Sequence, residues 1–139
     1  MGIHFLEDTM SELSTYATTL NDLAKTIYGR NAKVGWWTDL KTGEPIDPND
    51  LNVFGLKLAL VHSELSEALE AKRKNLMDDH LPHRSGVEAE LADAVIRIFD
   101  MAGAMGIELG TVLVEKLEYN AVRPDHKIEN RLQDNGKKG

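Results

Sequence analysis

Residues 51–76, LNVFGLKLALVHSELSEALEAKRKNL, and residues 85–105, SGVEAELADAVIRIFDMAGAM, decide the fold. In both stretches, apolar residues recur every three or four positions, which is the spacing of one face of an α-helix. A short polar break at 78–83, which contains a proline, separates them. A connection this short predicts two neighbouring antiparallel helices, of which the second carries apolar residues around most of its circumference and is expected to be buried on most sides.

Helix caps mark the ends of both stretches. Asn49 or Asp50 precedes the first stretch, and both residue types cap helix N-termini. Ser85 precedes the second, and Glu88 stands at the position that completes a capping box. Gly106 follows the second stretch and is expected to end its helix.

Two further helices are expected on either side of this pair. A heptad-like stripe predicts a first helix that ends near Tyr28–Asn31, with Gly29 as its left-handed cap. A fourth helix is expected over about 108–122, stopped by Pro124. Between the first two helices, the loop from about 29 to 50 is long for a compact domain, which favours a functional role. The residues of the stripe are Leu6, Met10, Leu13, Ala17, Leu20, Ala24 and Ile27.

No stretch alternates as a β-strand does, so the sequence predicts an all-α, four-helix bundle-like fold. A length of 139 residues fits one domain. We expect its core to cover about residues 6–123 and the polar tail from residue 125 to 139 to be loose.

Composition narrows the possible functions. Sixteen basic and 23 acidic residues give a formal charge of −7, which disfavours binding to nucleic acid or to anionic membranes. The chain has no cysteine, which excludes disulfides, cysteine-ligated metal centres and thiol catalysis. No apolar run approaches a membrane span and no signal peptide is evident, so a cytoplasmic protein is expected.

Two pairs of carboxylates stand three positions apart on the two helices of the central pair. Glu64 and Glu67 fall within the apolar arc of the first helix, at about 100° of rotation per residue. Glu90 and Asp93 share a narrow charged stripe with Arg97 on the second helix. Acids that face inward need cations beside them, because burying a bare charge is costly.

These pairs have two interpretations. Acids three positions apart are common on solvated helix faces, which is the simpler reading. Alternatively, the four carboxylates form a cage for a divalent cation, since Lys57 and Arg97 are too few to neutralise them. Oxygen ligands suit Mg²⁺ or Mn²⁺, and none of these glutamates is followed three residues later by the histidine that a ferritin-type di-iron site needs. Carboxylate-bound Mg²⁺ also binds substrate phosphates, which favours phosphate-ester or phosphoanhydride chemistry.

A family resemblance rests on three ordered motifs: SELSEALE at 63–70, ELAD at 90–93 and KLEYNAVRP at 116–124. The chain resembles the MazG-like, all-α nucleoside triphosphate pyrophosphohydrolases, whose signature is ExxE, a variable spacer and ExxD. Here 22 residues (68–89) form the spacer. The resemblance covers about residues 49–127, and the motifs are more specific as an ordered set than singly.

The resemblance implies cleavage of an NTP or dNTP between the α- and β-phosphates, which gives a nucleoside monophosphate and pyrophosphate. It implies Mg²⁺ as the cofactor, with Mn²⁺ as a substitute, and Glu67 as a residue that helps to generate the nucleophile. The implied metal ligands and catalytic residues are Glu64, Glu67, Glu90 and Asp93. The implied triphosphate contacts are Lys116, Asn120 and Arg123.

The chain departs from the family pattern after Pro124. Many relatives continue with a basic, glycine-rich stretch that ends in HGGK, whereas this chain has DHKIE at 125–129. Closure of the tail over the phosphates is therefore open. Arg97 has two equally weighted roles, contact with phosphate or charge balance for Asp93.

The tryptophans of the long loop are candidates for base recognition. Trp36 and Trp37 precede the first acidic helix, and an aromatic face stacks on a base. Relatives often use aromatic residues from this region, and of two adjacent residues we expect one to be buried and one available. Asn31, Asp39 and His62 are weaker candidates for reading a base edge.

Apolar surface on the first and third helices exceeds what one small bundle hides, which favours association. The resemblance implies homodimers, sometimes paired into homotetramers; a compact monomer is the alternative. Two other functions compete with the pyrophosphohydrolase. One is a non-catalytic helical interaction module, and the other is a related hydrolase that acts on dUTP or a phosphoribosyl-ATP.

Overall fold

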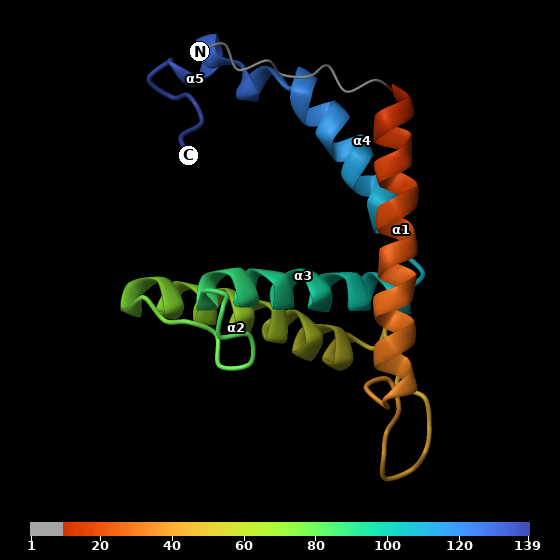
Figure 1. Cartoon of the computed structure of the whole chain (residues 1–139). Helices are drawn as coiled ribbons and strands as arrows, with labels where there is room; N and C mark the ends of the chain where they lie inside the picture. Colours follow the sequence, from red (N-terminus) through yellow and green to blue (C-terminus); the bar gives the residue numbers. More distant parts are fainter. Residues whose placement is uncertain (1–9) are drawn as a thin grey trace. The chain divides into compact units, whose positions relative to one another are not determined.

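The computed structural model describes residues 10–139 and is all-α across them, as expected (Figure 1). Within these residues no strand forms, and the only β-type pairings are two isolated bridges. Leu6 of the expected first stripe lies outside the described residues. The elements are α1 (Met10–Lys33), α2 (Leu51–Lys74), α3 (Gly86–Ala104), α4 (Leu109–Val122), a 3₁₀ turn η1 (Pro124–His126) and α5 (Ile128–Arg131).

The chain forms two compact units. One comprises Leu23–Ile107 and contains α2, α3 and the last part of α1. The other comprises the described residues up to Asp22 together with Glu108–Gly139, and it contains the first described part of α1, α4, η1 and α5. The predicted acidic residues all belong to the first unit.

The caps of α2 and α3 are those that the sequence predicts. Of the two candidates before α2, Asp50 is the cap: its carboxylate accepts hydrogen bonds from the backbone N–H groups of Asn52 and Val53 at 2.9 and 3.1 Å. Ser85 and Glu88 form the complete capping box at the start of α3. These bonds satisfy backbone donors that have no partner within the helix, so both helices begin at a defined residue.

Helices α2 and α3 run antiparallel and side by side (Figure 1). Small residues line their contact, which lets the two backbones approach closely. At one end, a Cβ atom on Gly86 would lie 2.7 Å from the Cβ of Ala71. At the other end of α3, a Cβ on Gly103 would lie 2.5 Å from the Cβ of Tyr28 on α1. The buried apolar residues of this unit are Ala24, Trp37, Val61, Ala68, Ala71, Ala94, Phe99 and Ala102.

The first helix is longer than the sequence predicts. It does not end at Tyr28–Asn31 but continues to Lys33, and Gly29 is an ordinary helical residue. Gly35, with a φ of +94°, takes the left-handed conformation instead. One exposed glycine inside a long helix costs only about 1 kcal/mol, which the remaining turns offset.

The loop from residue 34 to 50 is folded on itself. The backbone N–H of Asp39 donates to Glu44 at 2.8 Å, and that of Ile46 donates to Trp37 at 2.9 Å. The Asp39 carboxylate accepts from the N–H of Lys41 at 2.9 Å. These bonds fix the backbone on both sides of the tryptophan pair.

The expectation that the third helix is buried on most sides is wrong for the single chain. Leu91, Val95 and Ile98 on α3 are 48%, 46% and 40% exposed. Within its unit, α2 and the end of α1 cover one part of its circumference and leave these side chains uncovered.

The second unit is organised around Asn21 of α1. Its side-chain oxygen accepts from the N–H groups of Gly110 and Thr111 at 2.7 and 3.3 Å, and its amide donates to the Thr111 hydroxyl at 3.0 Å. Because Glu108 makes no side-chain cap, Asn21 satisfies the start of α4 from outside the helix.

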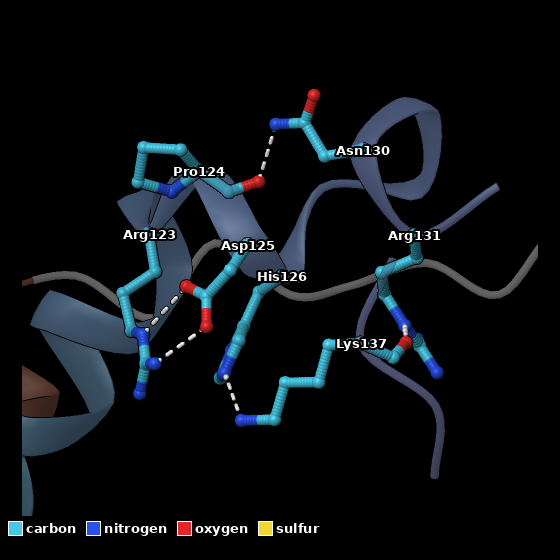
Figure 2. Close-up of polar contacts among 7 residues, drawn as sticks. All are labelled: Arg123, Pro124, Asp125, His126, Asn130, Arg131 and Lys137. Atoms are coloured by element: carbon cyan, nitrogen blue, oxygen red, sulfur yellow. Dashed lines mark hydrogen bonds and ion pairs between the residues drawn. The ribbon is translucent and has the colours of Figure 1, made fainter. Parts of the chain in front are cut away.

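The tail is more ordered than expected. After Pro124 it forms η1 and then α5, and the Asn130 amide donates to the Pro124 carbonyl at 2.5 Å (Figure 2). Among the described helices, none has the length and apolar character that crossing a membrane requires.

Candidate metal centre and adjoining pocket

The antiparallel packing of α2 and α3 brings together three of the four predicted ligands. Glu64 on α2 and Glu90 and Asp93 on α3 each offer a carboxylate oxygen, and these three oxygens lie within 4.8 Å of one another. Glu64 is buried, Glu90 is half-buried and Asp93 is exposed. We call these three residues the acidic trio. The trio therefore runs from the buried Glu64 to the exposed Asp93, so a ligand can reach it from solvent.

Glu67 lies beside the trio but is not part of it. The sequence places it on the inward arc, whereas its side chain is exposed. Residues three apart on a helix differ by about 60° in direction, so Glu67 points past the α2–α3 contact when Glu64 points into it. Its charge still reaches the trio, since it helps to raise the pKa of Glu90.

Arg97 on α3 forms an ion pair with Glu64, with Nε 2.5 Å from Oε1. The two roles expected for Arg97 were contact with phosphate and balance of Asp93. Its direct partner is instead Glu64, although its charge also acts on Asp93. Lys57, the other expected counter-charge, lies elsewhere: its ammonium is 4.4 Å from the centre of the Trp37 ring.

One cation among these acids leaves negative charge unbalanced. Burial opposes ionisation of Glu64, but hydrogen bonds from Arg97, Glu90 and Glu67 and the charge of Arg97 together outweigh it and hold the pKa of Glu64 below its usual value. Burial, together with the neighbouring Glu64 and Glu67, raises the pKa of Glu90 to about 7. Burial and the charge of Glu64 also raise the pKa of Asp93. A divalent cation would relieve this repulsion, and an all-carboxylate donor set fits Mg²⁺ or Mn²⁺.

The loop between α2 and α3 supplies residues that the sequence does not single out. Asp78 and His80 act electrostatically on Asp93: Asp78 raises its pKa and His80 lowers it. Both residues also line a pocket of about 350 Å³ with Glu67 and Glu90. Sequence spacing does not identify Asp78 and His80, because only the three-dimensional fold of the loop brings them near Asp93.

A larger pocket of about 640 Å³ lies next to the trio, and Arg97, the ion-pair partner of Glu64, lines it. Trp36 lines this pocket and is 64% exposed, while Trp37 is buried with 6% exposure. The expectation that one tryptophan is buried and the other available is therefore confirmed. The lining is mainly apolar and consists of Asn31, Trp36, Ile46, Val53, Leu56, Lys57, Leu60, Ile96, Arg97, Asp100 and Met101.

A polar cluster stands at the edge of this pocket. The indole Nε1–H of Trp37 donates to Asp100 Oδ1 at 2.9 Å, and Asp100 is only 7% exposed. The Lys57 ammonium over the Trp37 ring also lies 3.4 Å from the Trp36 carbonyl oxygen. Tyr28 packs edge-on against Trp37 with the ring centres 6.1 Å apart. The loop, α1, α2 and α3 are thereby held together at one point.

The weaker candidates for base reading separate clearly. Asn31 lines the pocket. Asp39 does not, because its carboxylate is used within its own turn. His62 is exposed on α2 and is not among the residues that line the pocket.

The expected triphosphate contacts belong to the other compact unit. Lys116 and Arg123 both lie over the Tyr119 ring, at 5.1 and 5.6 Å from its centre. The Arg123 guanidinium also makes a two-point ion pair with Asp125, at 2.9 and 2.6 Å, which lowers the pKa of Asp125 (Figure 2). The side-chain oxygen of Asn120 is buried, and no described residue donates a hydrogen bond to it.

Comparison of the chain with known protein families, with curated proteins and with solved structures found no match.

Proposed function

We propose that the protein is a Mg²⁺-dependent nucleoside triphosphate pyrophosphohydrolase of the MazG-like type. One observation carries the proposal: three carboxylates from two antiparallel helices converge within 4.8 Å beside a pocket of about 640 Å³. The converging carboxylates favour a polyphosphate bound through a metal ion. The pocket favours a ring, such as a nucleobase, attached to that polyphosphate. The ordered motifs of the sequence point to the same chemistry.

The metal would be held by Glu64, Glu90 and Asp93. The raised pKa values of Glu90 and Asp93 support this assignment, because burial and the neighbouring carboxylates both oppose ionisation there, and a bound cation would offset both effects. When bound, Mg²⁺ polarises phosphoryl oxygens and lowers the pKa of a coordinated water molecule.

The other residues of this unit have roles that follow from their positions. Glu67 is exposed beside the trio and is suited to accept a proton from an attacking water. Arg97 lies between the trio and the larger pocket, so its guanidinium can contact a phosphate of a ligand that spans both. Trp36 offers an exposed aromatic face for stacking on the base. The roles of Lys116, Asn120 and Arg123 as triphosphate contacts stay predictions from the resemblance.

We also propose that the protein associates into a homodimer or a homotetramer. Exposed Leu65 and Leu69 on α2 and Leu91 and Val95 on α3 leave apolar surface on the helix pair that carries the trio. A second copy would cover it. The substrates form the nucleotide pools of the cytoplasm, which is where we propose that the protein acts.

The test is incubation with each NTP and dNTP in Mg²⁺, with identification of the products. The proposal predicts a nucleoside monophosphate and pyrophosphate from at least one nucleotide, and loss of turnover in Asp93→Ala. Glu44→Gln, an exposed loop substitution, is the control and should keep full activity. Release of orthophosphate, or no turnover with any nucleotide, would overturn the proposal. The absence of any effect of Mg²⁺ and nucleotide on stability would favour a helical interaction module instead.

A further inference from the structure

Asp100 is the one buried carboxylate of the larger pocket. It is 7% exposed, lines the pocket with mainly apolar side chains, and lies one helical turn after Arg97. A polar group in such a place imposes strong selection on its ligand, because a partner that fails to match it leaves it buried and unpaired.

Trp37 fixes the orientation of this carboxylate. Its Nε1–H donates a hydrogen bond to Oδ1 of Asp100 at 2.9 Å. The buried indole ring is itself in contact with the Tyr28 ring and the Lys57 ammonium. No described residue donates a hydrogen bond to Oδ2, so this oxygen is the atom that Asp100 offers to a ligand. An ionised carboxylate only accepts hydrogen bonds, so the ligand must bring a donor.

Trp36 defines the shape of the ligand. Its exposed ring lines the same pocket, and an aromatic face favours a flat ring stacked on it. The pocket therefore favours a planar heterocycle with a hydrogen-bond donor at its edge.

We propose that the Trp37-oriented carboxylate of Asp100 makes this site selective for nucleobases that carry an exocyclic amino group in place of a carbonyl. This inference rests on the proposed function and specifies its substrates. Cytosine and adenine place an amino group where uracil and hypoxanthine place a carbonyl oxygen. The amino group donates to Oδ2, whereas the carbonyl oxygen would face a carboxylate oxygen that cannot donate to it.

The experiment uses substrates that differ at this one group. We expect kcat/KM for dCTP over dUTP, and for dATP over dITP, to be higher by about tenfold or more. Asp100→Asn exchanges the hydrogen-bond acceptor that faces the pocket for a donor. Its side-chain oxygen keeps the Trp37 hydrogen bond, because the indole can only donate, and its NH₂ then faces the pocket. The variant should lose the preference or reverse it, while Asp39→Asn, a carboxylate outside the pocket, should keep it.

Binding separates this inference from the proposed function. CMP and UMP are titrated in EDTA and followed by tryptophan fluorescence, and CMP should bind more tightly by a similar factor. If some nucleotides are hydrolysed but the matched pairs are used equally, the selectivity is overturned and the enzymatic proposal stands. If none is hydrolysed but CMP binds more tightly than UMP, the enzymatic proposal is overturned and the selectivity of the pocket stands. Equal binding, or no binding of either, together with no turnover, overturns both.

Discussion

Glu64 on α2 and Arg97 on α3 form an ion pair of 2.5 Å at the buried end of the acidic trio. The side chain of Glu64 is 9% exposed and that of Arg97 is 40% exposed, so one partner is buried and the other reaches solvent. The pair therefore has two functions. It compensates the most buried carboxylate of the trio, and it places a guanidinium group at the boundary with the larger pocket.

Loss of the Arg97 guanidinium should destabilise the protein. In Arg97→Met, the buried Glu64 carboxylate loses its partner, and we expect the free energy of unfolding to fall by about 1–3 kcal/mol in urea titrations without divalent cations. Arg73→Met is the matched control. It breaks a 3.8 Å pair with Glu70 in which both side chains are exposed, so its effect should be about 0–1 kcal/mol. Equal effects of the two substitutions would contradict the role given to the Glu64–Arg97 pair.

Glu90 should make the metal-free protein less stable as the pH rises. Its pKa is about 7 in the folded chain against 4.5 for an ordinary glutamate, so the folded state binds the proton more tightly. The contribution of Glu90 to stability is therefore fully present below about pH 4.5 and is lost as the pH rises through 7. Melting temperatures in EDTA between pH 5 and 8 should fall more steeply in the wild type than in Glu90→Gln. Parallel curves would show that Glu90 does not titrate in this window.

The exposed tryptophan should contribute to binding and not to chemistry. Trp36→Ala should raise KM by about ten- to hundredfold, the value of one stacking contact, with kcat nearly unchanged. Trp36→Phe retains an aromatic face and should keep most of the affinity. A fall in kcat without a change in KM would contradict a stacking role for Trp36.

Gly103 should be required for the crossing of α1 and α3. A Cβ at this position would lie 2.5 Å from the Cβ of Tyr28 and 2.9 Å from the carbonyl oxygen of Ala24. Gly103→Ala should therefore lower the free energy of unfolding by about 1–3 kcal/mol in urea titrations. Gly55→Ala on α2 is the opposite case: no atom lies within 4 Å of its Cβ, so better helix propensity should stabilise the protein by about 0.5–1 kcal/mol. The same sign for both would contradict the packing described.

The local features of the fold follow from the sequence because short-range chemistry determines them. The Ser85–Glu88 capping box and the Asp50 cap need only a few residues, and the all-α class follows from the apolar spacing. The prediction for the end of α1 is wrong. A glycine such as Gly29 ends a helix only if the free energy is lower when the chain turns there than when the helix continues. That balance depends on contacts along the whole helix.

The site could be predicted in part for the same reason. Spacing identifies Glu64, Glu90 and Asp93, but it also selects Glu67, which lies outside the trio because residues three apart on a helix differ by about 60° in direction. It cannot show that Arg97 reaches Glu64 across the helix contact, or that Asp100 is bound to Trp37, because these partners are 33 and 63 positions apart. Side chains that meet only through the packing of α2, α3 and the loop carry no signal in spacing.

The proposed activity depends on a divalent cation held by Glu64, Glu90 and Asp93. The direct test is titration of the full chain with Mn²⁺, with free Mn²⁺ followed by its electron paramagnetic resonance signal. We expect the wild type to bind Mn²⁺ and to release it when Mg²⁺ is added. Glu90→Gln and Asp93→Asn should bind Mn²⁺ at least about tenfold more weakly, because each loses a charged ligand. Mn²⁺ affinity that is the same in the wild type and in both variants would contradict the claim.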